Sequence, residues 1–345
     1  MDKKYLQSIA ESRELWDLYT FKNEYGSITP KYEGTAWGRL MVPQVSKHLL
    51  KNGYRASYPE GKGFAICLSH DVDDIYPPLT HKALASLYSL KDLNFRQMNK
   101  YLFWEFRGQK SSPYINFQQI IELEKKYGAK STFYCMAADR DPRRFRYNIE
   151  EITGEIQEIY NQGWDIGLHG GYYTFNDFEE MRKEKARLEK TLQGEVLGYR
   201  NHYLRFSVPK TWSYLERCGF KYDSTYGHNN AVGFRNGMCH PFQPRDFKSG
   251  QQFEIYEIPL HIMDGTLFGL SRNNEEAWNI ARELIDQAEK CHGVLTVLWH
   301  NDAFSCPFRT RWQKTYERLL DYGRKKNAWM TSHYEIWKWW KNHDY

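Results

Sequence analysis

The stretch FAICLSHDVDD (residues 64–74) joins a run of apolar residues to a dense group of polar side chains. FAICLS is typical of a buried strand in a parallel sheet. One histidine and three aspartates then follow within six positions, namely His70, Asp71, Asp73 and Asp74. An aspartate after a strand is more often a turn residue or a helix cap than a functional group. This stretch therefore indicates a functional site only if other strands also end in polar residues.

Short apolar runs alternate with helical patterns from Phe64 to the C-terminus. Strands are predicted at residues 64–69, 130–137, 165–169, 195–200, 220–224, 253–262, 293–300 and 328–332. Helices are predicted at residues 116–128, 149–163, 176–192, 208–219, 275–291, 309–325 and 334–342. This alternation is typical of an α/β fold in which helices flank a parallel sheet, and the number of repeats allows the sheet to close into a barrel.

Residues 1–60 do not follow the alternating pattern. We interpret them as an N-terminal extension packed on a barrel that occupies residues 61–345. Residues 228–252 form a long irregular segment, and such segments in compact domains are often functional. Within it, Arg235 and His240 are either solvated loop residues or contacts to an anionic group of a substrate.

Composition excludes several classes of protein. The chain has 345 residues with 48 basic and 43 acidic side chains, and this small surplus is spread too evenly to predict a nucleic-acid surface. Its six cysteines form no C-x-x-C pair, which favours reduced thiols and a reducing compartment. The charged start lacks the apolar core of a signal peptide, and no window reaches the ~20 apolar residues of a membrane span. We therefore expect a cytoplasmic protein without a membrane span.

Polar residues able to do chemistry follow five of the predicted strands. They are His70, Asp71, Asp73 and Asp74, then His169, then Arg200 and His202, then Asp223, and finally His300. In parallel α/β barrels the active site lies at the carboxyl ends of the strands, so these side chains are expected to share one rim. Asp264 also follows a strand and is either a substrate contact or a turn residue; because it precedes Gly265, we favour the turn.

The order of five short motifs resembles the polysaccharide deacetylases of the NodB-homology type, carbohydrate esterase family 4. These motifs read HDVDD, GLHGGYY, YRNHY, KYDST and LWH, and the resemblance covers the chain from about Phe64 to its C-terminus. The family fold is a distorted (β/α)₇ barrel. In the first motif one aspartate is the general base and a later one binds the metal, which implies Asp71 as base and Asp73 as ligand.

The other motifs imply further roles. The resemblance implies His169 as a metal ligand, Arg200 as the residue that orients the base, and Asp223 as the carboxylate that tunes the acid. In the fifth motif Leu298 is expected to line the acyl pocket and His300 to be the general acid. His70, Tyr173 and Tyr203 are further expected substrate contacts.

Two positions depart from the family pattern. The second motif normally carries another histidine four residues after the first, where this chain has Tyr173, and the third normally carries proline where this chain has His202. We hypothesise that His202 supplies the ligand that Tyr173 cannot; alternatively, His202 packs or binds substrate and the metal site is weak. His70 is a third possibility as ligand, although adjacent strand residues point to opposite faces, which separates it from Asp71.

An aspartate with two histidines and open positions is a common environment for catalytic Zn²⁺. Together with this donor set, the resemblance implies the metal-dependent removal of an N-acyl group, such as acetyl, from an amino sugar during surface-polysaccharide synthesis. A nucleotide-linked or lipid-linked sugar precursor is the expected substrate. Two alternatives remain open: a non-catalytic carbohydrate-binding relic of the same barrel, and a metal hydrolase of a non-sugar amide.

Overall fold

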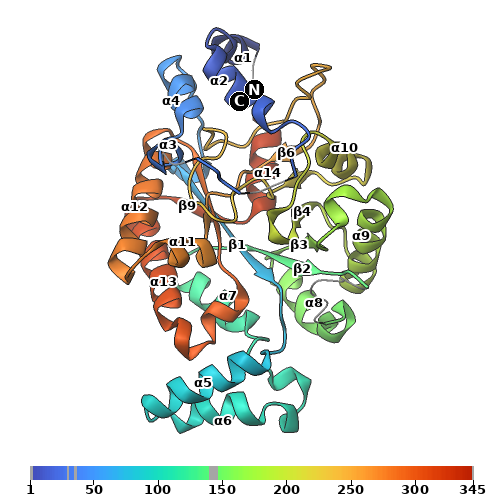
Figure 1. The fold of residues 1–345 in the computed structure, drawn as a ribbon, viewed down its shortest axis with the longest axis vertical. Helices are drawn as coiled ribbons and strands as arrows, with labels where there is room; N and C mark the ends of the chain where they lie inside the picture. Colours follow the sequence, from blue (N-terminus) through green and yellow to red (C-terminus); the bar gives the residue numbers. More distant parts are fainter. Residues whose placement is uncertain (1–2, 29–30, 35–36, 140–146, 344–345) are drawn as a thin grey trace.

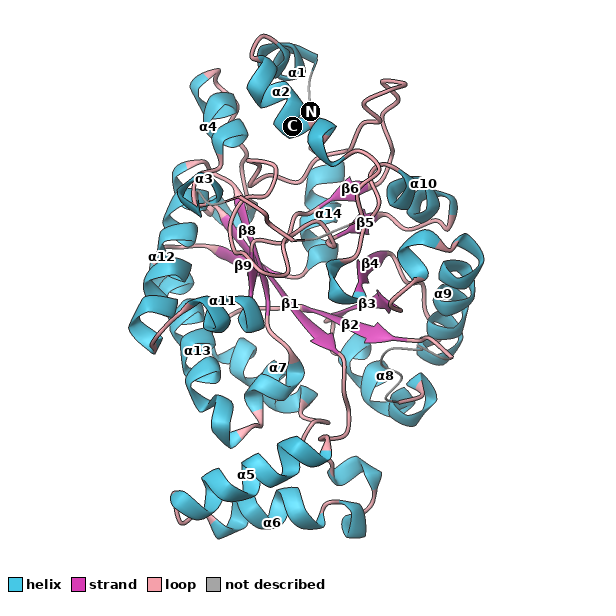
Figure 2. Cartoon of the chain, viewed as in Figure 1, coloured by secondary structure: helices cyan, strands magenta, loops and turns pink. Residues whose placement is uncertain are grey.

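The core of the molecule is one curved sheet in which every strand pairing is parallel (Figures 1 and 2). The computed structural model describes residues 3–28, 31–34, 37–139 and 147–343. The strand order is β6-β5-β4-β3-β2-β1-β8-β7, and β9 also pairs with β1. The strands are β1 (Ala65–Val72), β2 (Thr132–Met136), β3 (Asp165–Gly170), β4 (Gly198–Asn201), β5 (Tyr222–Asp223), β6 (Tyr256–Glu257), β7 (Ile262–Met263), β8 (Val294–Leu298) and β9 (Trp329–Thr331).

Strand β1 is the centre of this sheet and is buried along its whole length. Its first half pairs with β9, its second half pairs with β2, and β8 runs along its other side. The strand continues to Val72, three residues beyond the predicted boundary, because residues 69–72 pair with residues 132–135. Asp71 therefore lies within the strand, and Asp73 follows directly after it.

The two edges of the sheet are joined by one extended segment. A single strand was predicted at residues 253–262, but the structure forms two short strands there, β6 and β7, on opposite edges. Between them Ile258 donates its N–H to Asp223 of β5, and His261 donates to Thr296 of β8. The sheet is therefore closed through this segment into a distorted (β/α) barrel.

Helices surround the sheet on its outer side (Figure 2). The longer helices after β1 are α5 (Leu79–Lys91), α6 (Phe95–Phe103), α7 (Phe117–Lys126), α8 (Thr153–Asn161), α9 (Phe178–Leu192), α10 (Lys210–Arg217), α11 (Asp264–Leu270), α12 (Asn274–Lys290), α13 (Thr310–Lys325) and α14 (His333–Lys341). Helix α9 begins at Phe178, two residues after the predicted start, because Asp177 caps it through the N–H of Glu180. The six cysteines are free.

The N-terminal segment packs against the irregular segment 228–252. Helices α1 (Lys3–Ala10), α2 (Arg13–Tyr19), α3 (Trp37–Leu40) and α4 (Gln44–Lys51) precede the barrel. Arg235 is buried and paired with Glu24, and buried His240 contacts the Oγ of Ser46 at 2.9 Å. Arg235 and His240 are therefore neither solvated nor substrate contacts, and this part of the segment holds the N-terminal helices in place. The domain boundary near residue 60 remains a prediction.

A helical hairpin stands away from the barrel (Figure 1). It consists of α5 and α6, and β1 runs toward it at the carboxyl edge of the sheet. Sequence analysis predicted no helices here. Among the described residues, no helix has the length and apolar character needed to cross a membrane.

Candidate metal and catalytic site

Three side chains from separate segments meet at the carboxyl edge of the sheet. Asp73 follows β1, His169 lies in β3, and His202 follows β4. One ligand atom from each lies within 4.8 Å of the other two. Nε2 of His169 is 3.1 Å from Oδ1 of Asp73, and Nε2 of His202 is 3.7 Å from Oδ2. One carboxylate and two imidazoles are a donor set that fits a divalent cation such as Zn²⁺ and leaves positions open.

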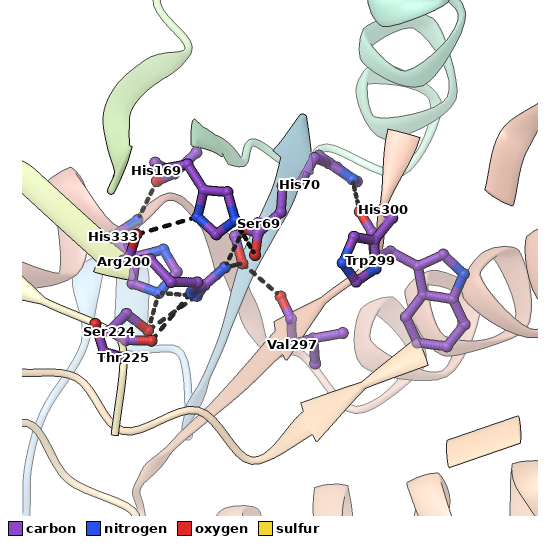
Figure 3. Close-up of polar contacts among 12 residues, drawn as sticks. Ser69, His70, His169, Arg200, Ser224, Thr225, Val297, Trp299, His300 and His333 are labelled. Carbon is purple, nitrogen blue, oxygen red and sulfur yellow. Dashed lines mark hydrogen bonds and ion pairs between the residues drawn. The ribbon is translucent and has the colours of Figure 1, made fainter. Parts of the chain in front are cut away.

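The ring of His169 is oriented by the backbone of the neighbouring strand. Its Nδ1 lies 3.0 Å from the carbonyl oxygen of Arg200, an atom that can only accept a hydrogen bond (Figure 3). The proton of a neutral ring therefore sits on Nδ1, and Nε2 presents its lone pair toward Asp73. Metal-binding histidines are commonly fixed in this way by a backbone carbonyl.

The charge of Asp73 is stabilised by the surrounding imidazoles. Burial by itself raises the pKa of this carboxyl group, but His202, His169 and His300 outweigh burial and hold the pKa well below its usual range. The carboxylate is thus ionised at neutral pH, as a cation ligand must be.

Asp71 is held by a buried arginine. Oδ1 of Asp71 accepts a hydrogen bond of 2.8 Å from Nη1 of Arg200, which is fully buried. Arg200 is fixed in turn by hydrogen bonds to Ser69 and Ser224 (Figure 3). Its guanidinium lies 4.4 Å from the centre of the Tyr134 ring. The second oxygen of Asp71 lies 3.7 Å from Nε2 of His169, so the carboxylate borders the ligand group.

His300 lies on the other side of Asp73 and is paired with Asp264. Nδ1 of His300 is 2.7 Å from Oδ1 of Asp264, and the N–H of His300 donates to Oδ2 at 2.9 Å. Burial lowers the pKa of His300, but Asp264, with Asp73 and Asp71 further away, raises it to about 10. Nε2 of His300 lies 3.9 Å from Oδ2 of Asp73, facing the ligand group.

The sequence suggested Asp223 as the carboxylate that tunes His300. The structure instead places Asp264 beside His300. Asp223 accepts a hydrogen bond of 2.6 Å from Thr225 and lies against Glu257 within the sheet. Burial raises the pKa of Asp223 to about 6. Asp264 was missed because it precedes a glycine, although its place after strand β7 is the signal that identified the other residues.

His70 lies on the opposite face of β1 from the ligand group. Its Nδ1 is 2.8 Å from the carbonyl oxygen of Trp299 (Figure 3). Its Nε2 is 2.9 Å from Oε1 of buried Glu124. The side chain is fully buried between β1 and the outer helices. The expected substrate contact at His70 is therefore not supported, and His70 is not near the ligands because strand pleating turns it away from Asp71.

The remaining predicted substrate contacts are Leu298, Tyr173 and Tyr203. Leu298 is buried in a small apolar cluster with Leu204, Leu260 and Met263. Tyr173 and Tyr203 are about half exposed, and Tyr172 makes edge contacts with both. Tyr203 also packs beside the ring of His202, with 4.3 Å between ring centres.

A cavity of about 220 Å³ opens beside His300. Its lining includes Asp73 and Asp264 from the site, His81 from α5, Arg309 directly before α13, and Trp312 in the first turn of α13. The guanidinium of Arg309 is paired with both oxygens of Asp302. The cavity therefore joins the candidate site to the base of the hairpin.

Comparison with protein-family models and with curated proteins gives no match. Among solved structures, a protein from Mycobacterium smegmatis assigned as a polysaccharide deacetylase matches with a TM-score of 0.56 and 17% identity, over 83% of this chain and 93% of the other. A probable polysaccharide deacetylase from Pseudomonas aeruginosa PAO1 matches with a TM-score of 0.55 and 15% identity, over 83% and 94%. The Puue allantoinase matches with a TM-score of 0.58 and 14% identity, over 91% and 99%. The chain therefore has the distorted barrel fold of the polysaccharide deacetylases.

Proposed function

We propose that this protein is a metal-dependent hydrolase that removes an N-acyl group from an amino sugar. The observation that carries the proposal is the grouping of Asp73, His169 and His202 within 4.8 Å, at the rim expected for a barrel active site. Two further pairs border this group, Asp71 with Arg200 and His300 with Asp264.

Asp73, His169 and His202 are the residues proposed to hold the cation, with Zn²⁺ as the expected ion. When bound, a cation of this kind supplies Lewis acidity toward an amide carbonyl and lowers the pKa of water. In this assignment His202 replaces the ligand lost at Tyr173. The same grouping argues against a non-catalytic relic, because a complete donor set remains beside an acid and a base.

Asp71 is proposed as the general base. A water molecule attacks the carbonyl carbon of the amide, and Asp71 accepts its proton at the oxygen that faces His169. Arg200 donates a hydrogen bond to the other oxygen, which fixes the direction of the carboxylate.

His300 is proposed as the general acid. Cleavage of the carbon–nitrogen bond requires a proton on the departing nitrogen, and Nε2 of His300 can donate it. Asp264 accepts from Nδ1, which orients the ring and keeps it protonated until that step. Each such proton transfer is typically worth ~10²–10⁴-fold in rate.

A sugar substrate is supported by the surroundings of the site. The apolar cluster around Leu298 suits the methyl group of an acetyl substituent. The half-exposed rings of Tyr173 and Tyr203 offer flat faces on which a sugar ring can pack. A nucleotide-linked or lipid-linked N-acetylated sugar is the proposed class, as part of surface-polysaccharide synthesis.

A second candidate is a hydrolase of a non-sugar amide. It is favoured by the Puue allantoinase, whose barrel matches 91% of this chain. Allantoin is a cyclic amide and not an acylated sugar, so the same arrangement of acid, base and ligands suits either substrate.

Release of free amine or acid from a substrate panel separates the two candidates. The panel contains N-acetylglucosamine oligomers, a nucleotide-linked N-acetylated sugar, a lipid-linked one, allantoin and a simple acetamide, each with zinc-loaded protein. We expect hydrolysis of at least one N-acylated sugar, and its loss in Asp71→Asn. Hydrolysis of allantoin alone, or of none of these compounds, contradicts the proposal.

A further inference from the structure

Large apolar side chains exposed to solvent are concentrated in the hairpin. Among the described residues the structure has 15 such side chains, and 10 of them lie between residues 79 and 106. These ten are Leu79, Leu84, Leu87, Tyr88, Leu90, Leu93, Phe95, Leu102, Phe103 and Phe106. Scattered exposed leucines are ordinary, but a concentration in one short segment marks an interaction surface.

Helix α5 is apolar on its outer side. Leu79, Leu87 and Leu90 are 80%, 63% and 50% exposed, and their spacing places them on the same face of the helix. Ala85 and Ser89 are buried and belong to the face that packs on the rest of the protein. This helix therefore presents its larger leucines to solvent and its smaller residues to the core, the reverse of an ordinary surface helix.

Helix α6 and the turn after it continue this surface. Phe95 and Leu102 are separated by two helical turns and are 54% and 40% exposed, whereas Tyr101 is buried. Phe106, in the short helical turn η3 (Glu105–Arg107), is 85% exposed. The apolar side chains thus extend from α5 across α6 to the end of the hairpin.

A basic groove of about 530 Å³ lies in the same hairpin. Arg96, Lys100 and Arg107 line it together with Asn94 and Ser111. Within the described part of the chain, none of these three cations is paired with a carboxylate. Burial and the neighbouring charge of Arg96 lower the pKa of Lys100, so an anion in this groove would relieve repulsion between cations.

We propose that residues 79–111, here called the hairpin surface, bind the surface of a membrane that contains anionic phospholipid. The segment carries six Lys or Arg and two Asp or Glu, a charge balance complementary to phosphate head groups. Leucine and phenylalanine beside Lys and Arg are the composition of helices that lie in the membrane interface.

The shape and position of the hairpin favour a membrane over a protein partner. The two helices project from the barrel (Figure 1). One side of the hairpin packs on the rest of the protein, and the exposed apolar side chains of the other side are available to a lipid surface. The base of the hairpin is also continuous with the candidate site, because His81 of α5 lines the cavity beside His300. Binding at this surface would bring that cavity toward substrates carried by lipid. This consequence rests on the proposed function, whereas the proposal of membrane binding does not depend on it.

Co-sedimentation with vesicles tests the proposal without any enzymatic assay. The full chain is mixed with vesicles of phosphatidylcholine alone, and with vesicles of phosphatidylcholine and phosphatidylglycerol in equal parts. We expect the chain to bind the vesicles that contain phosphatidylglycerol, and we expect this binding to weaken as the salt concentration is raised. The double variant Arg96→Gln/Lys100→Gln should lower the partition coefficient on the order of tenfold or more. The double variant Leu87→Gln/Leu90→Gln should abolish sedimentation with vesicles.

Matched variants on other surfaces serve as controls. Lys183→Gln/Lys190→Gln removes two exposed charges from α9, and Ile28→Gln removes an exposed apolar side chain, and both should bind vesicles as the unaltered chain does. Failure to bind either kind of vesicle would overturn the proposal, as would equal binding by all variants. Self-association that is lost in Leu87→Gln/Leu90→Gln, without vesicle binding, would instead assign the surface to a second copy of the chain.

Discussion

Nδ1 of His300 and Oδ1 of Asp264 lie 2.7 Å apart at the carboxyl edge of the barrel. The two residues follow neighbouring strands, since β7 ends directly before Asp264 and β8 ends two residues before His300. Their contact depends on the parallel pairing of these strands. It gives His300 both a fixed direction and a raised pKa, which are the properties of a general acid that works at neutral pH.

The variant Asp264→Asn tests this pairing. Asp264 raises the pKa of His300 to about 10, so loss of the carboxylate lowers that pKa, and the protonated acid is lost at lower pH. We expect turnover to fall by roughly 10²-fold and the alkaline limb of the pH–rate profile to move to lower pH. An unchanged alkaline limb would show that His300 is not the acid, and Asp223→Asn should leave that limb in place.

The variant Asp71→Asn separates catalysis from metal binding. The side chain keeps its shape and its contact with Arg200, but the amide cannot accept the proton of an attacking water. We expect metal content equal to that of the unaltered chain and a loss of turnover of at least ~10²-fold. Activity near the original level would reject Asp71 as the base.

The variant Arg200→Met tests the support of the base. Removal of the guanidinium leaves the buried Asp71 carboxylate without its cation and also removes the contacts to Ser69 and Ser224. We expect a loss of about 3–5 kcal/mol in the free energy of unfolding, measured by denaturant titration. Arg182→Met, an exposed arginine on α9, should change it by less than about 0.5 kcal/mol.

Much of the fold, and the proximity of Asp73, His169 and His202, could be predicted from sequence. Strands with continuous apolar runs, such as β1 and β8, were located correctly because burial on both faces leaves an unambiguous pattern. His169 and Asp73 were expected at one rim because each stands where such a strand ends, and their roles as ligands were implied by the resemblance to the polysaccharide deacetylases. His202 was hypothesised to supply the ligand that Tyr173 cannot, and the structure places His202 beside both Asp73 and His169.

The errors have local physical causes. Asp264 was recognised as following a strand, but the glycine after it favoured a turn, and the pairing of β7 with β8 that brings it to His300 was not predicted. The expected contact between His70 and substrate was wrong because β1 continues past His70. Pairing with β2 extends the strand and directs the His70 side chain to the face opposite Asp71. The helices of the hairpin surface were not predicted. Their apolar residues face solvent, so the sequence of this segment does not show the apolar stripe of a helix that packs on a barrel.

The metal content of purified, zinc-treated protein tests the central claim most directly. The measurement compares the unaltered chain with Asp73→Ala, His169→Ala and His202→Ala, with the half-exposed Tyr173→Ala as control. We predict close to one zinc ion per chain in the unaltered protein and in the control, and far less in each of the three ligand variants. An unaltered chain that binds no zinc, or a His202→Ala variant that keeps its full complement, would contradict the proposed metal site.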